Sequence, residues 1–180
     1  MKLNLGSCDR HIAGFLSVDI FPCAGVDLVA DLSLPWPWLD SSIEEVRAYD
    51  IFEHIGNCEH IGEQICNRCK RPEDPANKVR HWSGRIHAMG ELWRVLQPGG
   101  RAIVEVPSAT KGAGYAQDPT HVSPYCLNSF QYYEAGKIEP TRFAGPYGMA
   151  ARFRVIDLSE TSYTDRELVV KITAHLEAVK

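Results

Sequence analysis

The sequence has no long apolar run and no excess of positive charge, and each of these absences excludes a class of protein. It also has no internal repeat. No apolar stretch approaches the roughly 18 residues that a membrane-spanning helix needs. The first residues lack the apolar core of a secretory signal, so we expect a cytoplasmic protein that does not associate with membranes. The 23 acidic residues outnumber the 19 basic ones, and the net charge of −4 argues against sequence-independent binding to nucleic acid.

The composition that remains is that of a folded globular domain. The 180 residues are 44% apolar and 23% charged, which is typical of a globule and not of a disordered tail. This length suits one domain over residues 1–180 and is too short for two. Residues 57–80 are polar and rich in cysteine, and the apolar pattern resumes after them, so we interpret this segment as an insertion.

Short apolar runs rich in Val, Ile and Leu predict strands that are buried on both faces. These runs cover residues 2–5, 15–20, 26–30, 45–49 and 102–106. Residues 82–96 instead repeat apolar side chains at intervals of three and four, which predicts a helix, and a Pro-Gly-Gly turn at residues 98–100 ends it.

Residues 153–158 and 167–174 predict two further strands, and the short link between them favours an antiparallel hairpin. Together these patterns predict an α/β protein. We expect a Rossmann-like, doubly wound mixed sheet that is mostly parallel and ends in a C-terminal antiparallel hairpin.

Glycine and acidic residues follow the predicted strands, at the edge where ligands bind in open α/β sheets. Gly6 follows the first strand, and its lack of a Cβ atom lets backbone come close to a ligand. Asp19 follows the second strand, where a carboxylate can accept hydrogen bonds from ribose hydroxyls. Asp31 follows the third strand, where it could meet an adenine edge. The simpler interpretation is a glycine turn with surface acids, but acids at two neighbouring strand ends favour a nucleotide site.

Seven segments in order carry a family resemblance: LNLG (residues 3–6), VD (18–19), ADL (30–32), EHI (53–55), ELWRVLQPGGRAIVEVP (91–107), QDPTHV (117–122) and NSF (128–130). Their order resembles that of the class I S-adenosylmethionine-dependent methyltransferases, and more narrowly the small type 11-like group of predicted methyltransferases. The resemblance covers nearly the whole chain except residues 57–80. It implies that S-adenosylmethionine is the cofactor and that a methyl group passes to an unidentified small-molecule or macromolecular acceptor.

The resemblance also implies which residues contact the cofactor, from its amino-acid end and sugar to its adenine and methyl group. They are Leu5, Gly6, Ser7, Asp19, Ile20, Asp31, Leu32, Asp50 and Phe52. Among these, Asp19 would hold the ribose hydroxyls, Asp31 and Leu32 would meet the adenine, and Ile20 would lie against it.

Three residues are candidates for the base that removes a proton from the methyl acceptor: Glu53, His54 and His121. Methyl transfer is an in-line displacement in which the enzyme chiefly aligns the partners and removes one proton. A histidine titrates near neutral pH and suits that role. Alternatively, His121 fixes its loop through a neighbouring carbonyl, and Glu53 and His54 form the first turn of a helix, where the helix dipole favours Glu53.

Cys8 stands where the resembling family usually has a second glycine. If the turn needs a positive φ there, a cysteine costs roughly 1 kcal/mol relative to glycine. This departure motivates an alternative function: a non-catalytic protein of the same fold that binds a nucleotide-like ligand or a partner. A nicotinamide-dependent dehydrogenase is disfavoured because the first turn lacks the Gly-x-Gly-x-x-Gly pattern.

The insertion contains a possible metal site. Cys66 and Cys69 have the two-residue gap of a zinc knuckle, and Cys58 and His60 would complete a structural Cys3His site for zinc. His54 and His81 are rival fourth ligands, and a flexible loop with incidental thiols or a redox-active pair is the alternative.

Overall fold

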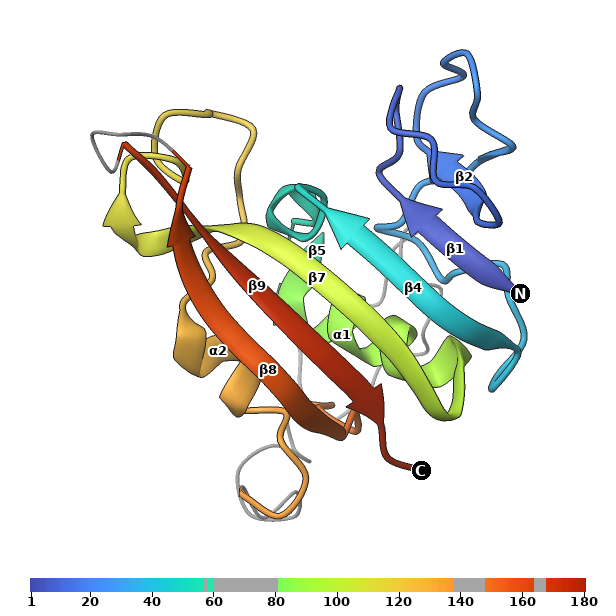
Figure 1. Ribbon diagram of the computed structural model, residues 1–180. Helices are drawn as coiled ribbons and strands as arrows, with labels where there is room; N and C mark the ends of the chain where they lie inside the picture. Colours follow the sequence, from blue (N-terminus) through green and yellow to red (C-terminus); the bar gives the residue numbers. More distant parts are fainter. Residues whose placement is uncertain (57, 60–80, 138–147, 164–167) are drawn as a thin grey trace.

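The computed structural model describes residues 1–56, 58–59, 81–137, 148–163 and 168–180, and only the backbone of residues 58–59 and 81–82. In this part of the chain, seven strands form one sheet in the order β3-β2-β1-β4-β7-β9-β8 (Figure 1). The strands are β1 (Lys2–Leu5), β2 (Leu16–Asp19), β3 (Leu28–Val29), β4 (Ile43–Tyr49), β7 (Leu96–Gly112), β8 (Phe153–Ser162) and β9 (Val169–Ala178). The other elements are the 3-10 helix η1 (Phe52–His54), the short pair β5 (Cys58–Glu59) and β6 (His81–Trp82), and the helices α1 (Gly84–Val95) and α2 (Leu127–Gln131).

Strand direction follows the predicted pattern. The neighbours from β3 through β7 pair in parallel, whereas β9 runs antiparallel to both β7 and β8. The mixed sheet with a C-terminal antiparallel hairpin is therefore confirmed. None of the helices in the described ranges is long and apolar enough to cross a membrane.

Helix α1 packs its apolar face on the sheet and fixes the chain after η1. Its buried face includes Met89 and Leu92, which are positions that the apolar periodicity predicts, and also Val95. At its start, a Cβ atom on Gly84 would lie 1.9 Å from the carbonyl oxygen of Ile55, so only glycine permits this contact. The start of α1 therefore touches the backbone that follows η1, where the site described below is built.

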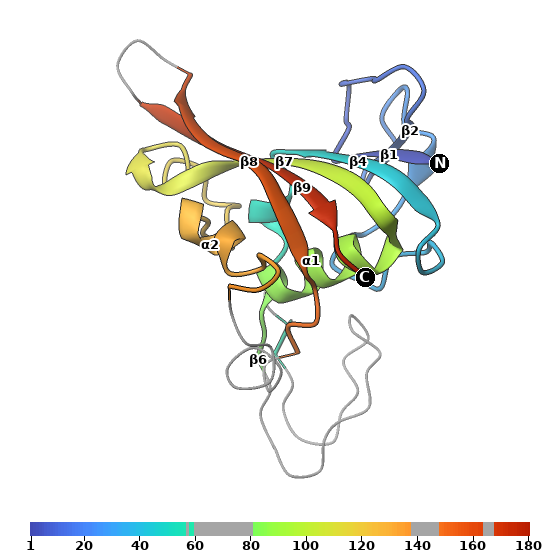
Figure 2. The same cartoon turned by 60° about the horizontal axis from the view of Figure 1, so that its bottom comes forward.

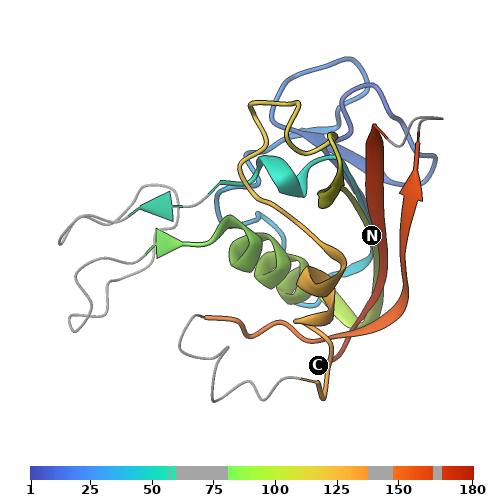
Figure 3. The same ribbon diagram turned by 90° about the vertical axis from the view of Figure 1, so that its left-hand side faces the viewer.

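The two faces of the sheet differ in character. One row of residues in register, Leu5, Ala48, Val104 and Ala174, is buried. The adjacent row on the opposite face reads Asn4, Arg47, Ile103 and His175. Helices α1 and α2 lie on the same side of the sheet (Figures 2 and 3).

Burial on both faces, predicted for the apolar runs, is correct for β1 and wrong for β4. Leu3, Asn4 and Leu5 of β1 are all buried, whereas β4 alternates between more and less exposed residues. The reason lies in the connections. The segments that join β1, β2 and β3, which are all described, contain no helix that could cover the second face of the sheet. Over β1 and β2 a loop covers this face instead, and the Asn4 side chain donates a hydrogen bond to the carbonyl oxygen of Arg10 in that loop (2.6 Å).

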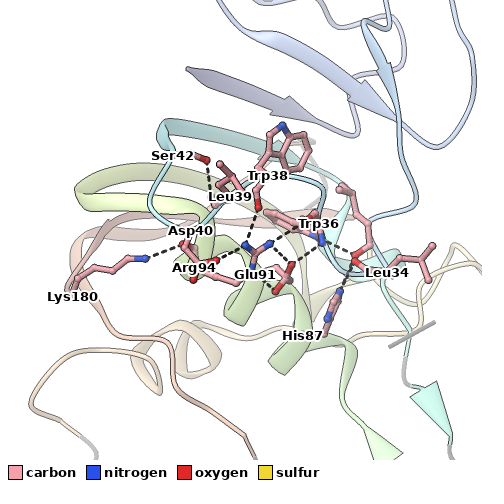
Figure 4. Close-up of polar contacts among 11 residues, drawn as sticks. Leu34, Trp36, Trp38, Leu39, Asp40, Ser42, His87, Glu91, Arg94 and Lys180 are labelled. Atoms are coloured by element: carbon pink, nitrogen blue, oxygen red, sulfur yellow. Dashed lines mark hydrogen bonds and ion pairs between the residues drawn. The ribbon is translucent and has the colours of Figure 1, made fainter. Parts of the chain in front are cut away.

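A buried polar network attaches the segment after Asp31 to α1 (Figure 4). The Glu91 carboxylate accepts hydrogen bonds from the Trp36 backbone N–H (2.7 Å) and from two nitrogens of Arg94 (2.8 and 2.9 Å). Arg94 also donates to Asp40 and to the carbonyl oxygen of Trp36. The segment that carries one wall of the site is thereby held on a rigid helix.

Candidate functional site

The turn after β1 requires a left-handed backbone at two positions. Gly6 has a φ of +65°, and a Cβ atom there would lie 2.8 Å from Cβ of Ile51, so no other residue fits. Cys8 has a φ of +39°, which confirms that cysteine stands at a position that favours glycine. The Cys8 N–H donates to Oδ2 of Asp19 (2.9 Å), which ties this turn to the end of β2.

Asp19 and Asp31 each organise their own turn. Asp19 accepts a second hydrogen bond through Oδ1 from the Phe21 N–H (3.0 Å). Oδ1 of Asp31 accepts from both the N–H (2.9 Å) and the hydroxyl (2.6 Å) of Ser33. Both acids thus stabilise turns, as the simpler interpretation of the sequence expects. Oδ2 of Asp31 takes no part in the two hydrogen bonds with Ser33.

These two acids also line one pocket, with a volume of about 140 Å³. Its lining residues come from the ends of β1, β2 and β3 and from the chain around η1. They are Gly6, Asp19, Ile20, Ala30, Asp31, Leu32, Ser33, Ile51, His54 and Ile55. Five residues that the resemblance implies in cofactor contact therefore lie together, along with the candidate base His54.

Three residues implied to contact the cofactor do not line this pocket. Leu5 and Phe52 are fully buried in the apolar core, and Phe52 packs edge-on against Trp36 at 6.5 Å between ring centroids. Ser7 is 2% exposed, and its N–H continues the pairing with β2 by donating to the carbonyl oxygen of Val18 (3.1 Å). The side chains at these positions face the interior of the protein, and their contact with the cofactor stays a prediction.

Asp50, a fourth residue implied to contact the cofactor, also lies outside this pocket, and its contact with the cofactor stays a prediction. Its carboxylate forms an ion pair with Lys171 of β9 (2.7 Å) and a longer one with Arg10 (3.3 Å), and it does not line the pocket. Lys171 also binds Glu105 at 3.0 Å. Asp50 therefore ties the end of β4 to β9.

The three candidate bases meet beside the pocket. Nε2 of His121 lies 3.9 Å from Oε1 of Glu53 and 3.6 Å from Oδ2 of Asp118. The rings of His54 and His121 meet edge to face, with centroids 4.7 Å apart. One ligating atom from each of Glu53, His54 and His121 falls within 4.8 Å of the others, and we call these three residues the Glu-His-His cluster.

Backbone contacts hold the two halves of this cluster together. The N–H groups of Val122 and Ser123 both donate to the carbonyl oxygen of Glu53, each at 2.9 Å. The Ser123 hydroxyl donates to the carbonyl oxygen of Ile55 (2.6 Å). The loop that carries His121 is therefore fixed to η1 independently of the side chains in the cluster.

Glu53 occupies a setting that disfavours its charge. It is 1% exposed, and neither carboxylate oxygen has a hydrogen-bond partner among the described residues. Burial is the main reason that its pKa rises to about 8, and the negative charges of Asp50 and Asp118 add to this effect. Its own backbone N–H and the charge of Lys171 oppose the rise.

Hydrogen bonds orient both histidines. Nδ1 of His121 lies 2.9 Å from the carbonyl oxygen of Tyr115, which is the loop-fixing contact of the alternative interpretation. Nδ1 of His54 lies 3.1 Å from the Thr120 hydroxyl, which in turn donates to Oδ1 of Asp118 (2.6 Å). The hydrogen bonds from Thr120 are the main reason that the pKa of Asp118 is lowered.

Sequence reasoning assigned no role to several residues of the site. Asp118 and Thr120 stand within a motif of the resemblance, and their spacing is typical of a turn in which the Asp side chain caps the backbone. That signal was available. Ile51 and Ile55 line the pocket without any sequence signal, because apolar residues after a strand look like core.

A larger cavity of about 460 Å³ lies beside α2. Among its lining residues are Tyr125, Tyr132, Tyr133 and Arg85, and it shares none with the first pocket. The Tyr125 hydroxyl is buried and has no hydrogen-bond partner in the part of the chain that the structure describes.

The predicted zinc ligands Cys58, His60, Cys66 and Cys69 lie outside the residues whose side chains the structure describes. The backbone of β5 and β6 pairs antiparallel at the base of this segment. The zinc site stays a prediction.

Comparison with known proteins identifies the fold. No protein-family model and no curated protein matches the sequence. A SAM-dependent methyltransferase from Methanosarcina mazei is similar in structure, with a TM-score of 0.56 at 12% identity over 99% of this chain and 92% of that one. The N-methyltransferase NodS from Bradyrhizobium japonicum WM9, solved with S-adenosyl-L-homocysteine, gives 0.54 at 9% identity over 99% and 78%. The [4+2]-cyclase SpnF gives 0.55 at 12% identity over 99% and 74%.

The chain therefore has the fold of the class I S-adenosylmethionine-dependent methyltransferases. Identities of 9–12% establish the fold alone. They do not single out the type 11-like group, which stays a prediction.

Proposed function

We propose that this protein binds S-adenosylmethionine and transfers its methyl group to an acceptor. The observation that carries the proposal is the pocket in which Asp19 and Asp31 lie with the glycine turn of Gly6, at the carboxyl ends of three neighbouring strands. The pocket of about 140 Å³ is smaller than the roughly 300–1,000 Å³ typical of sites for whole ligands. It would hold the nucleoside part of the cofactor, with the rest extending past His54.

The Glu-His-His cluster is the proposed place of the acceptor. His54 lines the pocket and belongs to the cluster, so an acceptor bound at the cluster would lie next to the cofactor. A carboxyl group with a pKa of about 8, such as Glu53, exchanges protons near neutral pH, which suits a group that takes a proton from the acceptor.

Asp31→Asn tests cofactor binding with little disturbance of the fold. Asparagine can keep both contacts to Ser33 through its carbonyl oxygen, while its amide replaces Oδ2. A hydrogen bond to a charged group contributes roughly 1.5–3 kcal/mol, so S-adenosylhomocysteine should bind roughly 10- to 150-fold more weakly in calorimetric titration. Asp157→Asn, an exposed acid on β8, is the control and should bind like the unmodified protein.

Two results would refute the proposal. One is the absence of binding by the unmodified protein at millimolar S-adenosylhomocysteine. The other is unchanged affinity in Asp31→Asn, because the pocket would then not be the site that holds the nucleoside.

A second candidate function is ligand or partner binding without methyl transfer. It is favoured by the positive φ of Cys8, a position that the resembling family gives to glycine. The likeness to the [4+2]-cyclase SpnF also fits an activity other than methyl transfer on this fold. If Cys8 has weakened cofactor binding, Cys8→Gly should raise the affinity for S-adenosylhomocysteine sharply.

The control for Cys8→Gly is Cys23→Ala. The two thiol sulfurs lie 3.7 Å apart, so Cys23→Ala removes their contact without changing the backbone at residue 8. Equal affinity in Cys8→Gly and the unmodified protein would count against this second function.

A further inference from the structure

We propose that the Glu-His-His cluster binds a divalent transition-metal ion, with Glu53, His54 and His121 as ligands. This site is distinct from the cysteine-rich insertion. It does not depend on methyl transfer, since it is argued only from the chemistry and geometry of the cluster.

In the neutral form of each ring, the hydrogen bonds around the cluster leave the second nitrogen of His54 and of His121 with a lone pair. A carbonyl oxygen only accepts hydrogen bonds, so the contact with Tyr115 places the ring hydrogen of His121 on Nδ1 and leaves Nε2 as an acceptor. The Thr120 hydroxyl gives its hydrogen to Asp118 and therefore accepts from Nδ1 of His54. Metal-binding histidines are typically oriented in this way, with the second ring nitrogen donating to a carbonyl or another outer partner.

The Glu53 carboxylate lies close to these histidines and accepts no hydrogen bond from the described residues. Both oxygens of Glu53 are buried without a hydrogen-bond partner among the described residues, and Oε1 is 3.9 Å from Nε2 of His121. Oδ2 of Asp118 lies 3.6 Å from the same nitrogen. One possible ligand atom from each of Glu53, His54 and His121 thus lies within 4.8 Å of the others, which is an arrangement that a cation stabilises once Glu53 is deprotonated.

The distances fit a metal site that needs only a small contraction. Bonds of about 2.0–2.2 Å from imidazole nitrogen or carboxylate oxygen place two ligand atoms at most roughly 4.3 Å apart. The separation of 3.9 Å between Glu53 and His121 lies within that limit, and the cluster as a whole spans 4.8 Å. The two hydrogen bonds to the Glu53 carbonyl hold the backbone in place for this contraction.

Imidazole and carboxylate ligands favour ions such as Zn²⁺, Co²⁺, Mn²⁺ and Fe²⁺ over Mg²⁺. His54 would place the ion at the wall of the pocket. If the proposed function is correct, the ion would lie where it can bind the acceptor and lower its pKa. In the metal-bound protein the ion would take over this role from Glu53, because a coordinated carboxylate is held deprotonated.

The test is a titration of the full chain with Co²⁺ after treatment with EDTA and its removal. We expect about one equivalent that gives cobalt absorption without a thiolate charge-transfer band, because this site contains no sulfur; a cysteine site in the insertion would give that band. Glu53→Gln and His54→Gln should each weaken this component at least 100-fold. His54 is exposed, so its variant should fold even if the buried Glu53→Gln does not. His175→Gln on the opposite face of the sheet is the control and should bind normally.

The proposal is overturned if no sulfur-free component appears, or if it persists unchanged in His54→Gln. Titration of the same metal-free samples with S-adenosylhomocysteine separates the two proposals. If the unmodified protein binds Co²⁺ at the sulfur-free site but does not bind S-adenosylhomocysteine, the proposed function is refuted and the metal site stands. If it binds S-adenosylhomocysteine but shows no sulfur-free Co²⁺ site, the metal site is refuted and the proposed function stands.

Discussion

Replacing Glu53 by glutamine should change how the stability of the protein depends on pH. The folded-state pKa of about 8 lies above the ordinary value of 4.5, so between these values the folded chain holds a proton that the unfolded chain has released. The free energy of unfolding therefore falls as pH rises through this window, by up to about 1.4 kcal/mol per pH unit. From about pH 5 to pH 8, this group should cost the folded state roughly 2–4 kcal/mol.

Glutamine resembles the protonated carboxyl, so Glu53→Gln should match the unmodified protein near pH 5 and exceed its stability near pH 8. Urea unfolding in EDTA at several pH values measures this difference, and EDTA prevents a bound metal from masking it. Glu44→Gln, at an exposed acid on β4, is the control and should follow the unmodified protein. Parallel profiles for Glu53→Gln and the unmodified protein would show that Glu53 titrates normally and would refute the reasoning.

Two further substitutions test the framework of the site by urea unfolding. Gly6→Ala should lose roughly 2–4 kcal/mol, from the left-handed backbone and from the contact with Ile51, whereas Gly14→Ala, with positive φ and nothing within 4 Å, should lose only the backbone part. Equal losses would show that Ile51 yields freely. Arg94→Met should lose about 3 kcal/mol or more because it leaves the buried Glu91 carboxylate without its partner, and a loss below about 1 kcal/mol would mean that the pair behaves as an exposed one.

The pocket was predictable where it depends on strand order. Asp19 and Asp31 each follow an apolar run, and the carboxyl ends of parallel strands share one edge of a sheet, so the sequence placed both acids at one site. The side chains of Phe52 and Asp50 were not predictable in the same way. Whether a residue just past a strand faces the pocket or the core depends on the turn that follows, and Asp50 takes a φ of +53° there.

The Glu-His-His cluster shows a second limit. Glu53 and His121 are far apart in the sequence, and what joins them is a pair of backbone hydrogen bonds from the loop to η1. No local pattern encodes such a contact. By contrast, the alternation of β9 was readable, since Val170, Ile172 and Ala174 occupy every second position and are the buried ones.

The loop that shields Asn4 is also the one that leaves the glycine turn of the pocket. One short stretch of chain, residues 6–15, thus begins with Gly6 at the pocket and continues as the loop over Asn4. Nδ1 of His11 in this loop lies 3.3 Å from the hydroxyl of Ser17 in β2. Even a conservative substitution of Ser17 should therefore affect Asp19, two residues further along the same strand. Because this short segment both covers the sheet and forms the glycine turn, a change in one of these two features should also affect the other.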